Sequence, residues 1–200
     1  MRILSAEGKI SMGRLKKGDL DTEGWTNLAT LQGRIDSAPL FIDDSPNMTL
    51  MEIRAKCRRL KQRNDLKLVV LDYLQLMSSG KKVESRQQEV SEFSRSLKLL
   101  AKELDVPVIA LSQLNRGSEQ RTDKRPMVSD LRESGSIEQD ADMVILLHRE
   151  DMYNPDSERV GEADMIIAKH RGGPTRTIPL AFSGKYSRFN NMANEAPPQY

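Results

Sequence analysis

The sequence predicts an α/β fold in which a mainly parallel β-sheet is flanked by helices and ends in a C-terminal hairpin. Two apolar runs of strand length, residues 68–76 and 106–113, are separated by one long amphipathic stretch. A strand, a helix and a strand in close succession require a right-handed parallel crossover. Residues 163–170 and 175–182 form two further apolar runs separated by the sequence GGP, which is typical of a hairpin.

The composition fits an ordinary globular domain and excludes some classes of protein. The chain has 200 residues, 38% of them apolar, and 31 Lys plus Arg against 29 Asp plus Glu, so its net charge of +2 does not indicate a nucleic-acid partner. No apolar stretch approaches the roughly 20 residues that span a bilayer, and the N-terminus lacks the pattern of a signal peptide. Cys57 is the only cysteine, which excludes an intramolecular disulfide and fits a reducing cytoplasm.

Three parts are expected along the chain: a helical and irregular part (1–48), the α/β core (49–189) and a disordered tail (190–200). In the first part, a helix is predicted to start near Asp21 or Thr22, because apolar and long side chains recur at helical spacing at Trp25, Leu28, Gln32 and Ile35. The sequence PLFIDD, residues 39–44, is predicted to form a short strand before a proline-containing turn.

Two helices are predicted in the core. The first begins at Thr49, which forms a capping box with Glu52, and its apolar face carries Leu50, Ile53, Cys57 and Leu60. Its basic residues fit either a solvated face or a contact with DNA. The second helix follows the polar segment 78–88, and its apolar stripe consists of Val90, Phe93, Leu97, Leu100 and Leu104. Strands are predicted on either side of it and at residues 143–148.

Polar side chains stand at the carboxyl ends of the two strands joined by the crossover. Asp72 and Gln113 occupy these ends, where parallel sheets bind ligands. A carboxylate can hold Mg²⁺ directly or through water, and an amide can sense a γ-phosphate or the attacking water. Asp72 by itself also fits a plain strand-end turn. Tyr73 follows it, so no carboxylate stands beside it to act as a base, and the chain contains no GxxxxGKS/T phosphate loop.

Two further segments carry candidate functional residues. Lys169 and Arg171 stand at the mouth of the predicted hairpin, where they fit either ordinary surface cations or an arginine finger that reaches across a subunit boundary. In the sequence SDLRESGSIEQDADM, residues 129–143, a loop with Arg132 and Gly135 could follow a phosphate backbone, or could simply be a solvated helix start. Neither His148 nor His170 has a partner at metal-ligand spacing, so both are interpreted as structural or solvated.

Taken together, LVVLDYLQLM, SRQQEVSEFSRSLKLLAKELDVPVIALSQLNR, KRPMVSDLRESGSIEQDADMVILLHRED and IIAKHRGGPTRTIPLAF resemble the C-terminal motor domain of the bacterial replicative helicase, the DnaB family. The resemblance covers nearly the whole chain in order. It implies a RecA-like ATPase core, here partial, in a homo-hexamer that uses ATP and Mg²⁺ to move 5′ to 3′ along single-stranded DNA in the cytoplasm. A primase and a helicase loader are its implied partners.

The resemblance also assigns roles to residues. Asp72 is similar to the Walker B aspartate on Mg²⁺, Gln113 to the residue that links the γ-phosphate to the DNA-binding loop, and Lys169 and Arg171 to the basic pair that reaches into a neighbouring ATP site. Arg132, Glu133 and Gly135 match the family's DNA-binding loop, and a second, weaker contact loop would contain Lys81, Lys82 and Arg86.

The family's phosphate loop, catalytic glutamate and N-terminal domain precede the residue that matches Met1. The chain is therefore expected to be a fragment that is inactive by itself.

Two alternatives remain open at this point. One is another RecA-like ATPase of recombination or repair, and the other is a non-enzymatic interaction module. A strand-exchange activity without unwinding would favour the first, and an absence of salt-sensitive DNA binding would favour the second.

Overall fold

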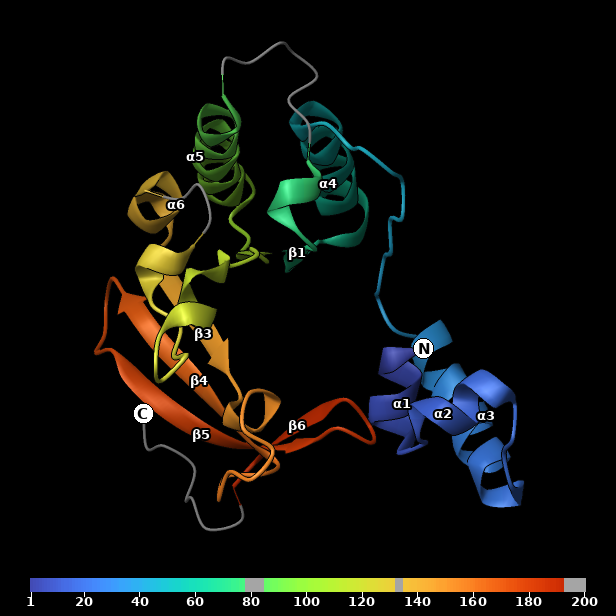
Figure 1. The fold of residues 1–200 in the computed structure, drawn as a ribbon. Coiled ribbons are helices and arrows are strands. Elements are labelled where there is room, and N and C mark those ends of the chain that lie inside the picture. Colours follow the sequence, from blue (N-terminus) through green and yellow to red (C-terminus); the bar gives the residue numbers. More distant parts are fainter. Residues whose placement is uncertain (78–84, 132–134, 193–200) are drawn as a thin grey trace. The chain divides into compact units, whose positions relative to one another are not determined.

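The structure is a computed structural model that describes residues 1–77, 85–131 and 135–192 (Figure 1). Its helices are α1 (Arg2–Gly8), α2 (Met12–Lys17), α3 (Thr22–Asp36), α4 (Leu50–Asn64), α5 (Arg86–Leu104) and α6 (Gly135–Asp140). Its strands are β1 (Val69–Leu71), β2 (Val108–Ala110), β3 (Met143–His148), β4 (Glu162–His170), β5 (Arg176–Ser183) and β6 (Arg188–Asn191). Short 3₁₀ turns are η1 (Leu74–Leu76), η2 (Arg116–Gln120), η3 (Val128–Asp130) and η4 (Glu150–Met152).

The chain packs as two compact units. Unit 1 contains residues 1–42, 147–165 and 177–200, and unit 2 contains residues 43–146 and 166–176. These units follow packing and not chain order, since unit 1 draws on both ends of the sequence. The division expected at residues 48 and 190 stays a prediction, although strand β6 extends to Asn191, two residues into the expected tail.

The core of unit 2 lies between helices α4 and α5 and the parallel pair β1–β2. Val69, Val70 and Leu71 stand opposite Val108, Ile109 and Ala110, which confirms the predicted parallel crossover through α5. The apolar stripe predicted for α5 is buried along its whole length, from Val90 to Leu104. Ile53 and Cys57 of α4 are buried in the same core, and burial raises the pKa of the Cys57 thiol.

The helix starts follow the predicted capping signals. The Thr49 side chain accepts a hydrogen bond from the backbone N–H of Glu52, and the Glu52 carboxylate accepts one from the backbone N–H of Thr49, so the capping box of α4 is complete. The Asp21 carboxylate likewise accepts a hydrogen bond from Gly24 at the start of α3. Each of these bonds satisfies a backbone donor that the first helical turn leaves unpaired.

The remaining strands form a four-stranded sheet in the order β3-β4-β5-β6. Strands β4 and β5 are neighbours joined by the short segment that contains Gly172 and Gly173, in agreement with the predicted hairpin. Strands β5 and β6 are antiparallel, with Phe182 opposite Phe189. Strand β6 was not predicted, because its sequence, RFNN, has only one large apolar residue.

One local prediction was wrong. Residues 39–44 do not form a strand, and Leu40, Phe41 and Ile42 are exposed, because this segment pairs with no strand in the part of the chain that the structure describes. The strand predicted to end at Asp72 spans Val69–Leu71, and the rest of the apolar run 68–76 passes into η1. Helix α3 begins at Thr22 as predicted; its buried residues are Gly24 and Leu31, whereas Trp25 is 55% exposed.

None of the helices in the described ranges is long and apolar enough to cross a membrane.

Leu100→Ala is expected to destabilise the protein, because Leu100 is fully buried in the core of unit 2. A buried leucine truncated to alanine loses about 2–5 kcal/mol of unfolding free energy. The neighbouring Leu99 is 56% exposed, so Leu99→Ala serves as the matched control and should change the free energy by less than about 0.5 kcal/mol. Urea denaturation measures both values, and equal losses in the two variants would contradict the packing described for α5.

Glu103→Gln is expected to flatten the acid dependence of stability. Arg58 and Arg54 of α4 donate to the Glu103 carboxylate on α5 and lower its pKa from 4.5 to about 2. A carboxylate whose pKa is depressed on folding contributes stability that is present above its unfolded pKa and is lost as the pH falls through its folded pKa. The melting temperature of the variant should therefore fall less than that of the parent between pH 4.5 and about 2.

Glu92→Gln provides the control for this experiment, since Glu92 lies exposed on the same helix and forms no ion pair with any residue in the described part of the chain. The same flattening in Glu92→Gln would show that the loss of any one negative charge, and not the loss of the ion pairs between α4 and α5, causes the effect.

Candidate functional site

The carboxyl ends of β1 and β2 bring Asp72 and Gln113 onto neighbouring segments. Asp72 follows directly after β1, and its side chain is exposed. Beyond the ladder, the backbone N–H of Leu111 donates to the carbonyl of Leu71 (2.9 Å), and that of Leu74 donates to the carbonyl of Leu111 (2.9 Å). Gln113, two residues farther along, is also exposed. A carboxylate and an amide therefore lie at one edge of the parallel pair, free to meet a ligand.

Gln75 joins these two strand ends, a role that was not predicted. Its side-chain Nε2 donates to Ser112 Oγ (3.0 Å), and its Oε1 accepts from the backbone N–H of Gln113 (3.2 Å). The available signal was a single amide inside the otherwise apolar sequence LQL. A half-buried polar side chain in such a run needs hydrogen-bond partners, and here both partners belong to the segment after the next strand.

Arg86, predicted to contact DNA, lies at the start of α5 with its guanidinium bonded to this same region. It donates to the carbonyl oxygens of Gln75 (2.8 Å) and Met77 (3.1 Å) and pairs with Glu89. The guanidinium also stands over the Phe93 ring, 5.8 Å from its centre. These contacts fasten the start of α5 to the segment that follows Asp72. Lys81 and Lys82, the other two residues of the predicted second loop, lie outside the described residues.

The segment after Gln113 is fixed to the residues that precede the predicted DNA-binding loop. Leu114 forms an antiparallel bridge with Leu131, and the backbone N–H of Asn115 donates to the carbonyl of Asp130 (2.7 Å). The Asp130 side chain is buried and pairs with Arg121, which lowers the pKa of Asp130 despite its burial. Gln113 is thus one residue away from a rigid connection to Leu131.

The three residues predicted for the DNA-binding loop follow Leu131 closely. Arg132 and Glu133 lie outside the described residues. Gly135 is the first residue of α6, and a Cβ atom at this position would meet open space. Among the described residues, no neighbouring atom therefore requires glycine there.

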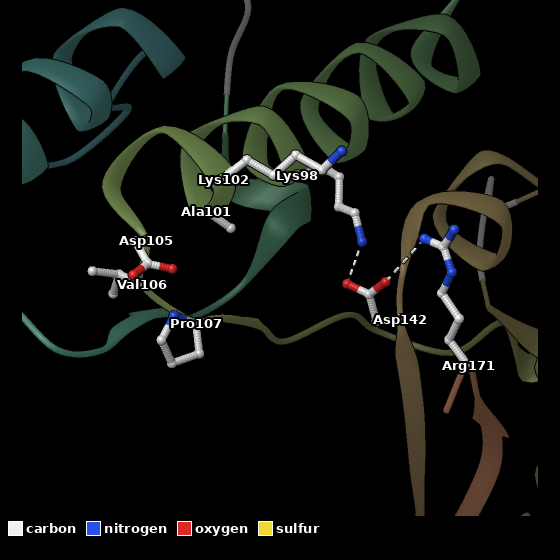
Figure 2. Close-up of a pocket in the computed structure, with 8 residues that line it drawn as sticks. All are labelled: Lys98, Ala101, Lys102, Asp105, Val106, Pro107, Asp142 and Arg171. Carbon is white, nitrogen blue, oxygen red and sulfur yellow. Dashed lines mark hydrogen bonds and ion pairs between the residues drawn. The ribbon is translucent and has the colours of Figure 1, made fainter. Parts of the chain in front are cut away.

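The predicted basic pair lies around the end of β4. Lys169 donates to the backbone carbonyls of Glu138 and Gln139 (3.3 Å to Gln139) near the C-terminus of α6. Arg171 is 77% exposed, its backbone N–H donates to the carbonyl of Asp142 (2.8 Å), and its guanidinium stands 3.5 Å from Oδ1 of Asp142. Figure 2 shows Lys98 of α5 reaching the other carboxylate oxygen of Asp142.

Asp142 therefore holds two cations at once. Lys98 and, to a smaller extent, Arg171 keep the pKa of Asp142 below its usual value. Since the Arg171 side chain is largely exposed, its ion pair is screened by water and is weak. Arg171 is thus held in place by its backbone while its guanidinium stays available to another partner.

A pocket of about 420 Å³ lies beside this group (Figure 2), and its lining residues are Lys98, Ala101, Lys102, Asp105, Val106, Pro107, Asp142 and Arg171. Val106 and Pro107 precede β2, so the pocket marks the amino end of the parallel pair. Asp72 and Gln113 stand at the carboxyl end of the same pair. Within one chain, unit 2 does not bring Arg171 together with Asp72 and Gln113.

In the described part of the chain, no group of three or more His, Cys, Asp or Glu side chains is arranged to hold a metal ion. The Asp72 carboxylate suits Mg²⁺ as one oxygen ligand beside water and phosphate oxygens, the usual arrangement for this ion. His148 stacks on Tyr153, with ring centres 6.1 Å apart, and His170 Nδ1 accepts from the backbone N–H of Gly172 (3.2 Å).

Sequence comparison relates residues 1–191 to the model of the DnaB-like helicase C-terminal domain. A replicative DNA helicase DnaB from Leifsonia xyli is 70% identical over 193 residues, which are 96% of this chain and 42% of that protein. Those of Mycobacterium intracellulare and Geobacillus stearothermophilus are 68% and 56% identical over the same length. The chain thus spans 34% to 42% of the length of these relatives.

Structure comparison gives the same family. A solved structure described as an ATPase domain is 44% identical, with a TM-score of 0.91 over 96% of this chain and 69% of that one. The structure of a DnaB-like replicative helicase and its interactions with primase has the same identity and TM-score, over 96% of this chain and 48% of that one. The predicted RecA-like α/β fold is confirmed, and the chain belongs to the family of DnaB-like helicase C-terminal domains.

Proposed function

We propose that this chain is the motor part of a hexameric replicative helicase, which couples ATP hydrolysis to 5′ to 3′ movement along single-stranded DNA and to unwinding of the duplex in the cytoplasm. The observation that carries the proposal is the match of 96% of the chain, at 70% identity, to a replicative DNA helicase. The exposed polar residues at the strand ends support it, because nucleotide-dependent motors place their metal ligand and phosphate sensor there.

In this proposal, Asp72 holds Mg²⁺ directly or through water, and the Gln113 amide bonds to the γ-phosphate of ATP. The exposure of both side chains beyond β1 and β2 supports these roles. Mg²⁺ would neutralise the charge on the phosphates during transfer. A phosphate loop is absent from the 200 residues, and no carboxylate follows Asp72, so we propose that another segment of the helicase supplies the phosphate loop and the catalytic glutamate.

Lys169 and Arg171 are proposed to act on the ATP bound by a neighbouring subunit. Their position supports this, because Arg171 lines a pocket at the amino end of the parallel pair, whereas Asp72 and Gln113 stand at its carboxyl end. In a ring, the amino end of one subunit's sheet can face the carboxyl end of the next. Because the ion pair between Arg171 and Asp142 is weak, the guanidinium could leave Asp142 at little cost in free energy.

Arg132, Glu133 and Gly135 are proposed to hold the DNA backbone, with a weaker contact from Lys81, Lys82 and Arg86. The bridge between Leu114 and Leu131 supports the idea that a movement of Gln113 caused by the γ-phosphate is passed directly to this loop.

A solved relative is described with its interactions with primase, and we propose that the helicase of this chain likewise meets a primase and a loader.

The 200-residue chain by itself is expected to bind ATP weakly and not to hydrolyse it, because it contains no phosphate loop. Steady-state ATP hydrolysis, with and without single-stranded DNA, and titration with a fluorescent nucleotide measure the two properties. Robust turnover by the purified chain would show that its own residues form a complete site, contrary to the proposal.

Arg171→Ala is expected to lower the rate of ATP hydrolysis by at least about 10³-fold in an assembled ring, the usual effect of losing an arginine finger. A suitable ring is the G. stearothermophilus helicase in which residues 1–191 of this chain replace the matching segment, since the two are 56% identical. Arg176→Ala, an exposed arginine on β5, is the matched control and should hydrolyse ATP like the parent.

A mixing experiment tests whether Arg171 acts between subunits. Rings of Arg171→Ala subunits mixed with subunits that retain Arg171 but have an inactive phosphate loop should regain part of the activity, because each mutant site can then receive an arginine from its neighbour. Mixed rings that stay as inactive as either variant alone would argue that Arg171 acts within its own subunit.

A further inference from the structure

Gln75 uses both polar atoms of its side-chain amide and its backbone carbonyl to join separate elements near the proposed ATP site. The side-chain amide bonds to Ser112 (3.0 Å) and to the backbone of Gln113 (3.2 Å), both beyond β2. The carbonyl accepts from Arg86 at the start of α5 (2.8 Å). One residue of η1 therefore connects the end of β1, the end of β2 and the start of α5.

The backbone does not hold Gln113 in the same way. In the described ranges, the backbone hydrogen bonds that link the two strand ends stop at Leu111, which bonds to Leu71 and Leu74. Gln113 is exposed, and its N–H is fixed by Gln75 Oε1. The next fixed points along the chain are the Leu114–Leu131 bridge and the bond from Asn115 to Asp130.

We propose that Gln75 is a positioning residue that fixes Gln113 relative to Asp72, so that the γ-phosphate sensor and the metal ligand keep one spacing. The inference rests on the proposed function, because it assigns Gln75 a task in the same site. Gln75 does not touch the nucleotide in this role. It acts through Gln113, and through Arg86 it joins the strand ends to α5.

This arrangement has a consequence for coupling between ATP and DNA. Gln113 lies between Gln75 on one side and the Leu114–Leu131 bridge on the other. The bond from Gln75 sets where Gln113 stands before the γ-phosphate reaches it. Loss of Gln75 would leave Gln113 without this defined position, so the pull of the γ-phosphate would reach the Leu114–Leu131 bridge only in part. ATP hydrolysis would then continue while its response to DNA weakened.

Three variants separate the contacts. Gln75→Met keeps a side chain of similar length but loses both hydrogen bonds. Gln75→Glu keeps the Oε1 acceptor for the Gln113 N–H, and its other carboxylate oxygen can accept a hydrogen bond from the Ser112 hydroxyl. Ser112→Ala removes only the Ser112 contact and leaves the Gln113 bond in place.

The first measurement is amide hydrogen exchange in the 200-residue chain, which requires no ATP or DNA. In Gln75→Met, the Gln113 amide should exchange about 3- to 10-fold faster, the range expected for the loss of one hydrogen bond, while the Leu111 amide keeps its protection. Gln75→Glu and Ser112→Ala should leave the Gln113 amide protected. An unchanged Gln113 amide in Gln75→Met would overturn the positioning role.

The second measurement is the ratio of ATP hydrolysis with single-stranded DNA to hydrolysis without it, in the chimaeric ring described above. Gln75→Met should lower this ratio about 10-fold, with KM for ATP within about 2-fold of the parent, since Gln75 itself makes no contact with the nucleotide and Gln113 is still present. A parental ratio combined with fast Gln113 exchange would show that Gln75 is only structural.

The same ring separates failure of this inference from failure of the proposed function. Asp72→Ala and Arg171→Ala should each abolish hydrolysis there if the proposed ATP site is correct. If both variants stay active, the proposed site is wrong. If both are inactive while Gln75→Met keeps the parental ratio, only the positioning role is wrong.

Discussion

The burial of one face of α5 against the parallel pair β1–β2 is the interaction on which unit 2 depends. Two parallel strands cannot be joined by a tight turn, so the chain must cross the sheet, and α5 makes this crossing with an apolar stripe buried from Val90 to Leu104. The stripe fixes which face of the pair is covered. Because the two strands run parallel, the residues that follow each strand emerge at the same edge, where Asp72 and Gln113 are found.

Around the core formed by α5 and the β1–β2 pair, polar contacts mainly fix the positions of neighbouring segments. Gln75 ties the strand ends together, Arg86 ties the same region to α5, and the buried Asp130 pairs with Arg121 beside the bridge to Leu131. Breaking one partner of a half-buried pair leaves an unsatisfied group, so such contacts hold their elements in single arrangements. In the proposed function, this rigidity would allow a small change at a phosphate to be passed to a distant loop.

In the proposed function, the positions of the charged residues explain why one chain would not form a complete ATP site. Asp72 and Gln113 stand at the carboxyl end of the parallel pair, while Arg171 shares its pocket with Val106 and Pro107 at the amino end. A rigid sheet cannot bring its two ends together. In the proposed role, Arg171 would therefore meet the carboxyl end of a neighbouring copy's sheet, and the proposed ring would repeat that contact at every subunit.

By itself, the sequence determined the elements whose apolar pattern is long and regular, and only the tertiary structure decided which partners the short segments and polar side chains found. The stripe of α5, the capping box of α4 and the crossover were predicted correctly, because helix period, capping chemistry and crossover topology are local or nearly local rules.

Residues 39–44 carry a strand pattern but have no neighbouring strand in the described part of the chain, and β6 forms because Phe182 offers Phe189 a partner. The bonds of Gln75 and Arg86 join residues up to 38 positions apart. Strand pairing and side-chain hydrogen bonds depend on what lies opposite in space, which spacing along the chain does not specify.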